Sequence, residues 1–377
     1  MIYKLGKIGA GEGIALIAML LLPNIYLSEP SLAIGFVGSS AWLLKLVSGV
    51  IAVAMLLFVI RFYQAYVERY QSGKLVSFYD FLRCAVGGRL ATALFLGWAV
   101  LFEVQTILTL REFADYVLIT TLPTNRLAIL LLLFSATIVL ILCRGLEVVL
   151  RVSYLLFAIA FLGIVLMALL LLGAYEFSHL FPWQGYGLGA LARHSFCDLG
   201  TWSVGLAILL VMPNLQNLQT VKKAVYYGFG YTMFLKSLVI AAALMIFGVV
   251  VAPERALLFY ETVQTINLSQ YFQRVEAVFV ILWLTGGLLS AALMQYFSLT
   301  MACQPFKVND MPALLPLAVL MSASFALLPA SAIAAIELSR VLVYRVENTF
   351  MLLSFIMIAF GYYKRIRGAA SCAGVTK

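Results

Sequence analysis

Long apolar stretches recur along the chain, and short polar connections separate them. A helix needs about 20 mostly apolar residues to cross a bilayer, because lipid cannot hydrogen-bond to exposed backbone groups. About ten stretches approach this length. We therefore predict an all-α polytopic membrane protein with about ten transmembrane helices. The predicted spans are residues 9–28, 41–60, 90–110, 127–143, 152–174, 199–213, 229–251, 275–301, 311–329 and 346–363.

Composition agrees with this pattern. Hydrophobic residues make up 64% of the 377 residues and charged residues 11%, whereas soluble domains carry about 25% charged residues. No hydrophilic stretch is long enough for a separate soluble domain. We therefore expect residues 1–377 to form a single integral membrane domain.

The distribution of basic residues predicts the orientation of the chain. The net charge is +9, and most Lys and Arg residues fall in cytoplasmic segments if both termini are placed inside. This is the positive-inside bias, so we expect both termini to be cytoplasmic. The basic residues would then meet anionic lipid rather than nucleic acid. The connection 61–89 mixes basic and aromatic residues, which suits a helix in the lipid headgroup layer.

Glycine and proline interrupt the first and sixth predicted spans. Span one has glycines at its start and Pro23 near its end, while span six contains Gly200 and Gly205 and closes with Pro213. Interrupted segments at matching positions in two five-span halves are typical of a transporter, whose broken helices offer backbone groups to a ligand. Glycines also permit close helix packing, and the sequence alone leaves both interpretations open.

Charged residues inside the spans are candidates for function. Glu103 lies in the middle of span three and Lys236 lies inside span seven. An intramembrane charge is costly and usually faces a cavity or a partner. A Glu103–Lys236 pair would satisfy both residues, and a structural role, a ligand contact and a proton site all remain open. Lys45 lies near the end of span two, from where its side chain can reach the membrane surface.

No catalytic or metal-binding motif is evident in the chain. It has no G-x-S-x-G sequence, no P-loop and no Cys/His arrangement. Its five cysteines form no close pair and no zinc spacing, so we expect free thiols. We therefore predict neither an enzyme nor a cofactor or metal site.

Several short patterns occur in a fixed order relative to the predicted spans. They are Arg111-Glu112-Phe113 and Leu122-Pro123-Thr124 after span three, Gly145-Leu146-Glu147 with Arg151 after span four, and Arg274, Glu276, Phe279 and Trp283 at the start of span eight. In this order they resemble the R-E-F, G-x-E-x-x-x-R and R-x-E patterns of the spore germination permease family, the B-type subunits of germinant receptors. The resemblance extends from about residue 7 to residue 363, although Asn125 replaces a proline that is usual in the family.

The resemblance implies a fold and a set of partners. The fold is that of the amino acid–polyamine–organocation superfamily, a LeuT-type 5+5 inverted repeat with helices one and six broken. This agrees with the glycine and proline pattern. The implied partners are an A-type membrane subunit and a C-type lipoprotein, and the implied location is the spore inner membrane or cell membrane.

From these observations we expect the membrane subunit of a spore germinant receptor. It would bind a small nutrient such as an amino acid between spans one, three, six and eight. The predicted ligand-binding residues are Gly200 and Gly205 through their backbone, with Glu103 and Trp283 lining the pocket. The alternative is an H+- or Na+-coupled amino acid transporter, in which Glu103 and Lys236 would serve coupling.

The matched motifs also predict ion pairs. Arg274 and Glu276 lie two residues apart and cannot pair with each other along one helix. We therefore expect cross-helix pairs, either Arg111 with Glu276 or Glu112 with Arg274, that lock spans three and eight at the outer mouth. A further pair follows from spacing alone, since Glu147 precedes Arg151 by four residues in the favourable order.

Overall fold

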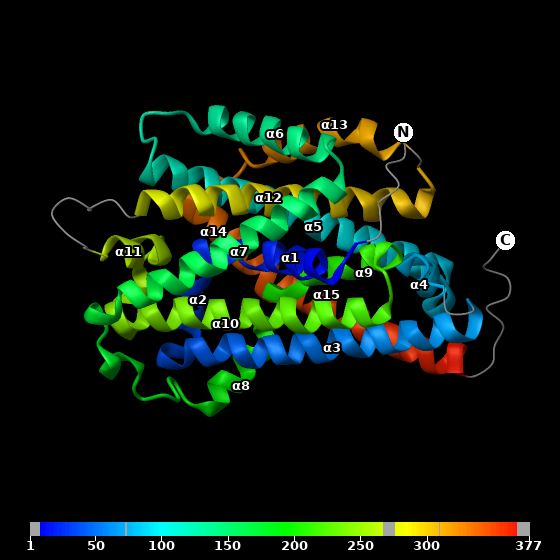
Figure 1. Ribbon diagram of the computed structural model, residues 1–377, viewed down its shortest axis with the longest axis horizontal. Helices are drawn as coiled ribbons and strands as arrows, with labels where there is room; N and C mark the ends of the chain where they lie inside the picture. The colour runs from blue at the N-terminus through cyan, green and yellow to red at the C-terminus, as the bar shows by residue number, and fades with distance from the viewer. Residues whose placement is uncertain (1–7, 72–73, 267–275, 309, 368–377) are drawn as a thin grey trace.

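The computed structural model describes residues 8–71, 74–266, 276–308 and 310–367, and its regular elements within these ranges are helices (Figure 1). Seven helical segments are long and apolar enough to cross a membrane, and three shorter apolar helices accompany them. The long segments are Glu29–Tyr70, Gly88–Thr120, Leu146–Leu170, Leu188–Asn214, Leu218–Glu254, Phe279–Phe306 and Ala332–Lys364, and the shorter ones are Ala10–Tyr26, Leu127–Cys143 and Met311–Phe325. The prediction of an all-α polytopic fold is confirmed.

The α-helices follow one another in this order: α1 (Ala10–Leu21), α2 (Glu29–Val37), α3 (Ala41–Tyr70), α4 (Phe78–Val86), α5 (Gly88–Thr120), α6 (Leu127–Cys143), α7 (Leu146–Leu170), α8 (Leu188–Cys197), α9 (Ile208–Val211), α10 (Leu218–Val251), α11 (Leu258–Gln264), α12 (Glu276–Cys303), α13 (Met311–Phe325), α14 (Ala332–Val341) and α15 (Asn348–Gly361). Three other helical segments complete the parts used below: the 3-10 segments η1 (Pro23–Tyr26) and η5 (Asp198–Ala207), and the π-helical segment η9 (Leu342–Glu347).

The first span is broken between α1 and α2. Pro23 has no N–H to continue the α1 ladder, and the chain tightens into η1, in which the N–H of Leu27 bonds to the carbonyl of Asn24 at 3.1 Å. Leu27 itself is extended, with φ −98° and ψ −153°. A new helix then begins at Glu29, with Pro30 in its first turn, a favoured position for proline. Gly38, with φ +67°, ends α2 and separates it from α3 within the segment Glu29–Tyr70. We assign α2 to the first span, which then runs past residue 28, where the sequence predicted its end, to Val37.

The sixth span is also irregular. Its helix α8 begins at Leu188, eleven residues before the predicted start, and gives way to the ten-residue 3-10 segment η5. The segment η5 is buried over nearly all of its length and contacts α1, α3, α15 and η9. The polar residues of α8 hid this part of the span from a hydropathy-based prediction. With both irregular spans present, the predicted LeuT-type arrangement with broken helices one and six is confirmed.

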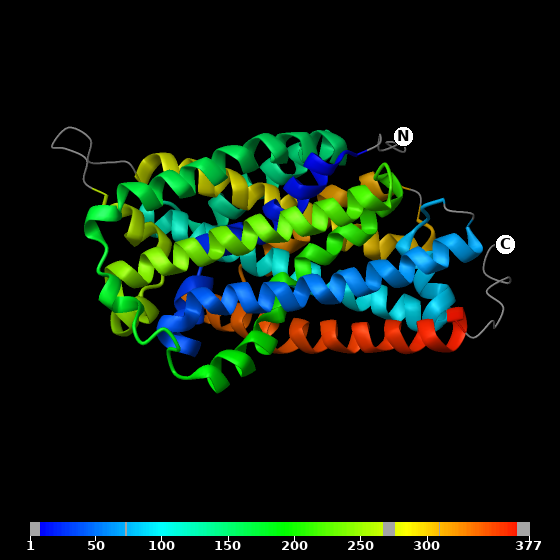
Figure 2. The same cartoon turned by 60° about the horizontal axis from the view of Figure 1, so that its bottom comes forward.

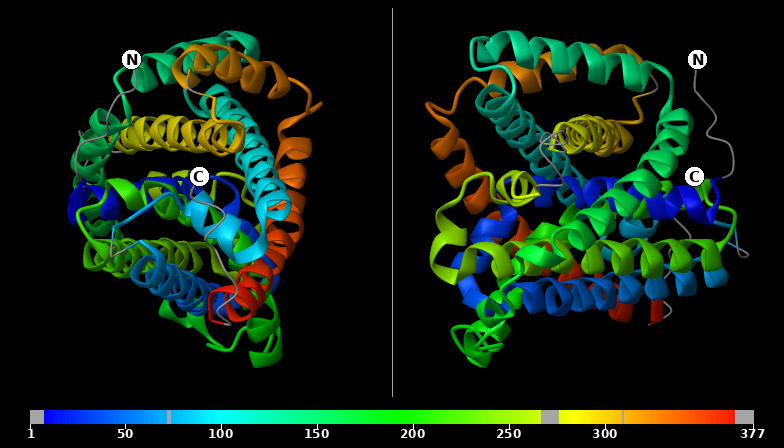
Figure 3. Two further views of the ribbon diagram at one scale, coloured as in Figure 1. Left: turned by 90° about the vertical axis from the view of Figure 1, so that its right-hand side faces the viewer. Right: turned by 60° about the vertical axis from the view of Figure 1, so that its left-hand side comes forward.

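Most helices run along the long axis of the molecule. Figure 2 shows α3, α10 and α15 extending in roughly the same direction, with α10 and α15 both in contact with α3. A view from one end shows α6 and α13 together outside α5 and α12, against which both pack (Figure 3). The irregular segments η1, η5 and η9 lie within this bundle, and they position the site described below.

The short helix α4 packs against the main apolar core. Its aromatic residues Phe78, Tyr79 and Phe81 are buried in the main apolar core, and α4 packs against α5. The apolar face of α4 therefore covers a protein surface, which an amphipathic pattern alone cannot distinguish from lipid. The expected position of the connection 61–89 in the headgroup layer stays a prediction.

Candidate functional site

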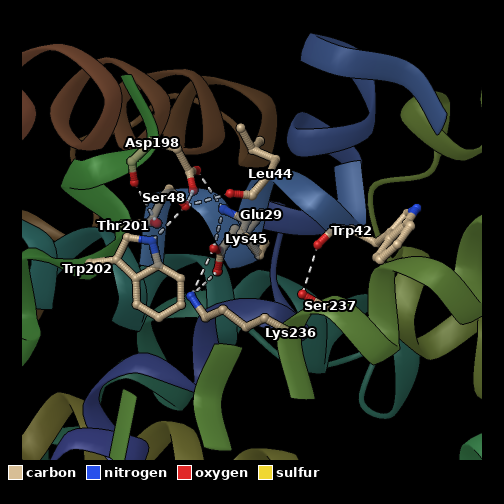
Figure 4. Close-up of polar contacts among 10 residues, drawn as sticks. All are labelled: Glu29, Trp42, Leu44, Lys45, Ser48, Asp198, Thr201, Trp202, Lys236 and Ser237. Carbon is tan, nitrogen blue, oxygen red and sulfur yellow. Dashed lines mark hydrogen bonds and ion pairs between the residues drawn. The ribbon is translucent and has the colours of Figure 1, made fainter. Parts of the chain in front are cut away.

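Four charged side chains meet in the interior of the bundle (Figure 4). Glu29 is the first residue of α2 and Asp198 is the first residue of η5, so each acid comes from an irregular span. Lys45 comes from α3 and Lys236 from α10. Glu29 is 7% exposed and the other three are 0% exposed. We call these four residues the ion quartet.

The ion quartet is formally neutral and closely paired. Lys45 Nζ lies 2.7 Å from Glu29 Oε1 and 2.6 Å from Asp198 Oδ1. Lys236 Nζ donates to both carboxylate oxygens of Glu29, at 2.9 and 2.8 Å. Lys45 therefore bridges the acids of spans one and six, and Lys236 adds a second pair to Glu29. Such burial is tolerable only because each charge has a counter-charge at contact distance.

Neutral groups complete the hydrogen bonding around the quartet. Ser48 Oγ donates to the second oxygen of Asp198 at 2.6 Å, and Trp202 Nε1 donates to Ser48 Oγ at 3.0 Å. The ammonium of Lys236 lies 5.0 Å from the centroid of the Trp202 ring, which is a cation–π distance. The quartet is thus tied to η5 through Asp198 and Trp202 together.

A pocket lined largely by polar residues lies beside Glu29. Its empty space is about 430 Å³ when space open to solvent is counted. The break of span one, α5, η5, α14 and η9 all contribute to it. Its lining residues are Asn24, Leu27, Ser28, Glu29, Leu32, Gln105, Thr109, Glu112, Thr201, Ser339, Arg340, Val343 and Tyr344. We call it the polar pocket.

Two polar atoms of this lining are buried without a partner. Gln105 Oε1 and Tyr344 Oη have no hydrogen-bond partner among the residues that the structure describes. Glu112 is 2% exposed and accepts a hydrogen bond from Ser28 Oγ at 3.2 Å. Buried polar groups are normally satisfied by protein, water or ligand. A water molecule or a polar ligand in the polar pocket would complete the hydrogen bonding of these two atoms.

Glu103 lies on α5 but does not line the polar pocket. Its carboxylate accepts hydrogen bonds from Gln295 Nε2 at 2.7 Å, from Ser298 Oγ at 2.9 Å and from Ser322 Oγ. These donors belong to α12 and α13, so Glu103 joins three helices on another face of α5. Its predicted role in ligand binding stays a prediction.

The structure corrects the predictions for the two intramembrane lysines. A Glu103–Lys236 pair is wrong, because Lys236 binds Glu29. Lys45 does not reach the membrane surface, since its side chain is fully buried between Glu29 and Asp198. Lysine stems are long enough for either outcome, and here buried carboxylates decide it.

The two predicted glycines allow close packing of η5. A Cβ added at Gly200 would collide with the backbone carbonyl oxygen of Val343 in η9, and one added at Gly205 would lie 2.6 Å from the ring of Phe229. Gly200 directly precedes the pocket residue Thr201, whereas Gly205 lies deeper, against α1 and α10. The proposed contact between their backbone and a ligand stays a prediction.

Trp283 does not line the polar pocket either. It is 4% exposed and stacks on Phe113, with a centroid distance of 5.5 Å. It borders a separate apolar cavity with Tyr26 and Phe259. The four predicted ligand-binding residues therefore do not surround one pocket, and the predicted role of Trp283 is untested.

The motif charges at the end of α5 make different contacts from those expected. Arg111 binds Asp115 at 2.7 Å and donates to the carbonyl oxygens of Ala326 and Pro329, at 3.0 and 2.9 Å. It therefore ties α5 to the connection after α13. The pairs Arg111–Glu276 and Glu112–Arg274 stay predictions: Arg274 lies outside the described residues, and the side chain of Glu276 is not among those described.

The remaining motif pair and the four cysteines that the structure describes are not part of the lining of the polar pocket. Arg151 Nη2 lies 2.6 Å from Glu147 Oε1, the pairing that their spacing predicts. Both side chains are exposed, so the pair adds little stability. Cys143, Cys197 and Cys303 are free thiols, whereas Cys84 is disulfide-bonded, contrary to expectation.

Both acids of the ion quartet escaped prediction from the sequence. Glu29 directly follows the predicted end of span one, and Asp198 directly precedes the predicted start of span six. Both were thereby assigned to connections. One usable signal was the Ser28-Glu29-Pro30 sequence, which has an acid and a proline where a second helix of a broken span can begin.

The arrangement defines a class of protein: a helical membrane protein with a transporter-like fold and a polar pocket at a break in its first span. Two solved structures share the fold. One is Mhp1, a nucleobase-cation-symport-1 family transporter in a closed conformation with bromovinylhydantoin bound, at TM-score 0.60 and 16% identity, covering 100% of this chain and 82% of that one. The other is a Na+-coupled sialic acid symporter in a substrate-bound outward-open state, at TM-score 0.64 and 11% identity, covering 99% and 91%.

Sequence comparison identifies the family. Residues 7–334 match the model of the family described as spore germination protein, and the chain belongs to this spore germination permease family. The chain is also similar to spore germination protein KB of Bacillus subtilis (strain 168), with 22% identity over 277 residues, 72% of each protein. The family and the structural neighbours are permeases and transporters rather than enzymes.

Proposed function

We propose that the protein is the membrane subunit of a spore germinant receptor, which binds a small nutrient such as an amino acid and thereby triggers germination. Membership of the spore germination family supports the biological role. The observation that carries the binding role is the polar pocket, which lies at the break of span one and contains buried polar atoms without partners. A surface that only held subunits together would have no need for such atoms.

The position of the polar pocket suggests how binding would be transmitted. A ligand there would touch the break of span one, α5, η5 and η9. If these segments exchange between two conformations, the ligand would shift the equilibrium toward the conformation that it binds more tightly. The size of the shift is set by the difference in its affinity for the two conformations. The ion quartet joins spans one and six beneath the ligand, so the two spans would respond together.

We further propose that the receptor acts with an A-type membrane subunit and a C-type lipoprotein in the spore inner membrane, with both termini cytoplasmic. The family match supports the partners, and the distribution of basic residues supports the orientation. Partner subunits would convert the conformational shift into the later steps of germination.

An H+- or Na+-coupled amino acid transporter is the second candidate. Glu103 favours it, because this membrane carboxylate has only neutral hydrogen-bond donors among the described residues and is a reasonable proton site. Coupling to Na+ through Glu29 or Asp198 is disfavoured, because lysine ammonium groups already neutralise both acids.

Proteoliposomes containing the purified chain separate the two functions. Binding of radiolabelled amino acids is measured alongside their accumulation, with and without an imposed H+ or Na+ gradient. The receptor predicts saturable binding without accumulation in any gradient. Accumulation driven by either gradient would contradict it and support the transporter, and absence of binding would contradict both.

A further inference from the structure

Buried hydrogen-bond acceptors on α5 line one face of the polar pocket. Gln105, Thr109 and Glu112 follow the i, i+4, i+7 spacing, which places them on the same side of the helix. Gln105 is 4% exposed, and its Oε1 has no donor among the described residues. The α5 face of the polar pocket therefore offers an acceptor that its own surroundings leave unsatisfied.

The charges around the polar pocket are also unbalanced. Lys45 and Lys236 neutralise Glu29. Arg340, the basic residue of the lining, already binds Glu337 with Nε at 2.9 Å and Nη2 at 2.5 Å. Among the described side chains, Glu112 accepts hydrogen bonds only from serine hydroxyls, and its charged neighbour Asp115 is another acid. One buried carboxylate of the lining thus has no counter-charge in the described part of the chain.

Resting on the proposed function, we infer that the polar pocket recognises its ligand through a protonated primary amine, which Glu112 and Gln105 Oε1 bind together. An ammonium brings one positive charge and three N–H donors. Glu112 lacks a counter-charge and Gln105 Oε1 lacks a donor, and an ammonium group supplies both. A hydroxyl group would supply a donor without the charge. Tyr344 Oη, also without a partner, is left to donate to an oxygen of the same ligand.

The test uses the full-length chain purified into lipid nanodiscs. Thermal stabilisation by each standard L-amino acid selects the tightest one, which is then compared with its 2-hydroxy acid, where a hydroxyl replaces the amine. We expect the 2-hydroxy acid to bind at least roughly tenfold more weakly, because it loses a charge-assisted hydrogen bond. Glu112→Gln should reduce this preference to below roughly threefold, since the counter-charge is gone.

A matched control is the same change at an exposed carboxylate, Glu68→Gln near the end of α3, which should keep the full preference. Equal binding of both compounds, or an unchanged preference in Glu112→Gln, would overturn amine recognition and leave nutrient binding intact. Stabilisation by no amino acid would contradict the proposed function instead. If Glu112→Gln does not fold, Gln105→Met is tested in its place. Weaker binding of the amino acid alone would support amine recognition, and equally weaker binding of both compounds would overturn it.

Discussion

The lysines of the ion quartet account for two charges that the membrane interior would otherwise disfavour. Lys45 and Lys236 are both fully buried, and each finds its counter-charge on an irregular span. Replacing a whole buried ion pair by apolar residues of similar volume often leaves the stability of a protein unchanged. Removing only one partner leaves an uncompensated buried charge, which is strongly destabilising. The quartet therefore makes the junction of spans one and six sensitive to single substitutions.

Asp198→Asn should destabilise the protein strongly. It leaves Lys45 with Glu29 alone and gives the quartet a net positive charge, a change that typically costs about 3–5 kcal/mol. We expect a clearly lower midpoint of thermal unfolding in detergent, with Asp310→Asn, an exposed acid, unchanged. Equal midpoints for the two variants would show that the quartet contributes nothing to stability.

Removing one acid and one base together tests whether the unpaired charge causes the loss of stability. Lys45→Met combined with Asp198→Leu deletes one base and one acid, so the remaining Glu29–Lys236 pair is neutral again. We expect the double variant to unfold at a higher temperature than Asp198→Asn, despite carrying more changes. A double variant that is less stable than Asp198→Asn would mean that packing, rather than charge, dominates here.

At the scale of elements, the contact between η5 and η9 depends on a missing side chain. Gly200 faces the carbonyl of Val343, and backbone atoms cannot swing aside as a side chain can. Gly200→Ala should therefore cost about 1–3 kcal/mol by overpacking and displace η9 from the polar pocket. Gly230→Ala is the control, since its added Cβ meets nothing within 4 Å and alanine favours a helix by about 1 kcal/mol. The measurement is the midpoint of thermal unfolding of each purified variant. A midpoint for Gly200→Ala at or above that for Gly230→Ala would contradict the close approach of Gly200 to the backbone of Val343.

The elements show which parts of the fold a sequence can predict. Apolar stretches and the proline at position 23 indicated the spans and the first break, because bilayer thickness and a missing N–H act locally. The quartet escaped prediction because its acids flank the apolar stretches, and α8 is too polar to register as membrane helix. The polar pocket joins residues from four stretches that lie far apart in the chain, and no local pattern encodes such a meeting.

For the whole molecule, the basic residues predict which end faces the cytoplasm. Lys223 lies at the start of α10 and Arg193 lies in α8, and both side chains are exposed. In intact cells, a membrane-impermeant thiol reagent should label Arg193→Cys above the level of the unsubstituted chain, whereas Lys223→Cys should require permeabilised cells. The reverse pattern would place both termini outside and overturn the orientation.

We propose that a nutrient bound in the polar pocket triggers germination. The most direct test is dipicolinic acid release from spores in which this gene is the sole B-type receptor gene, challenged with single amino acids. We predict a response to particular amino acids that is lost on deletion, restored by the wild-type gene or Gly230→Ala, and not restored by an equally abundant Gln105→Met variant. An unchanged response after deletion, or full restoration by Gln105→Met, would contradict the account.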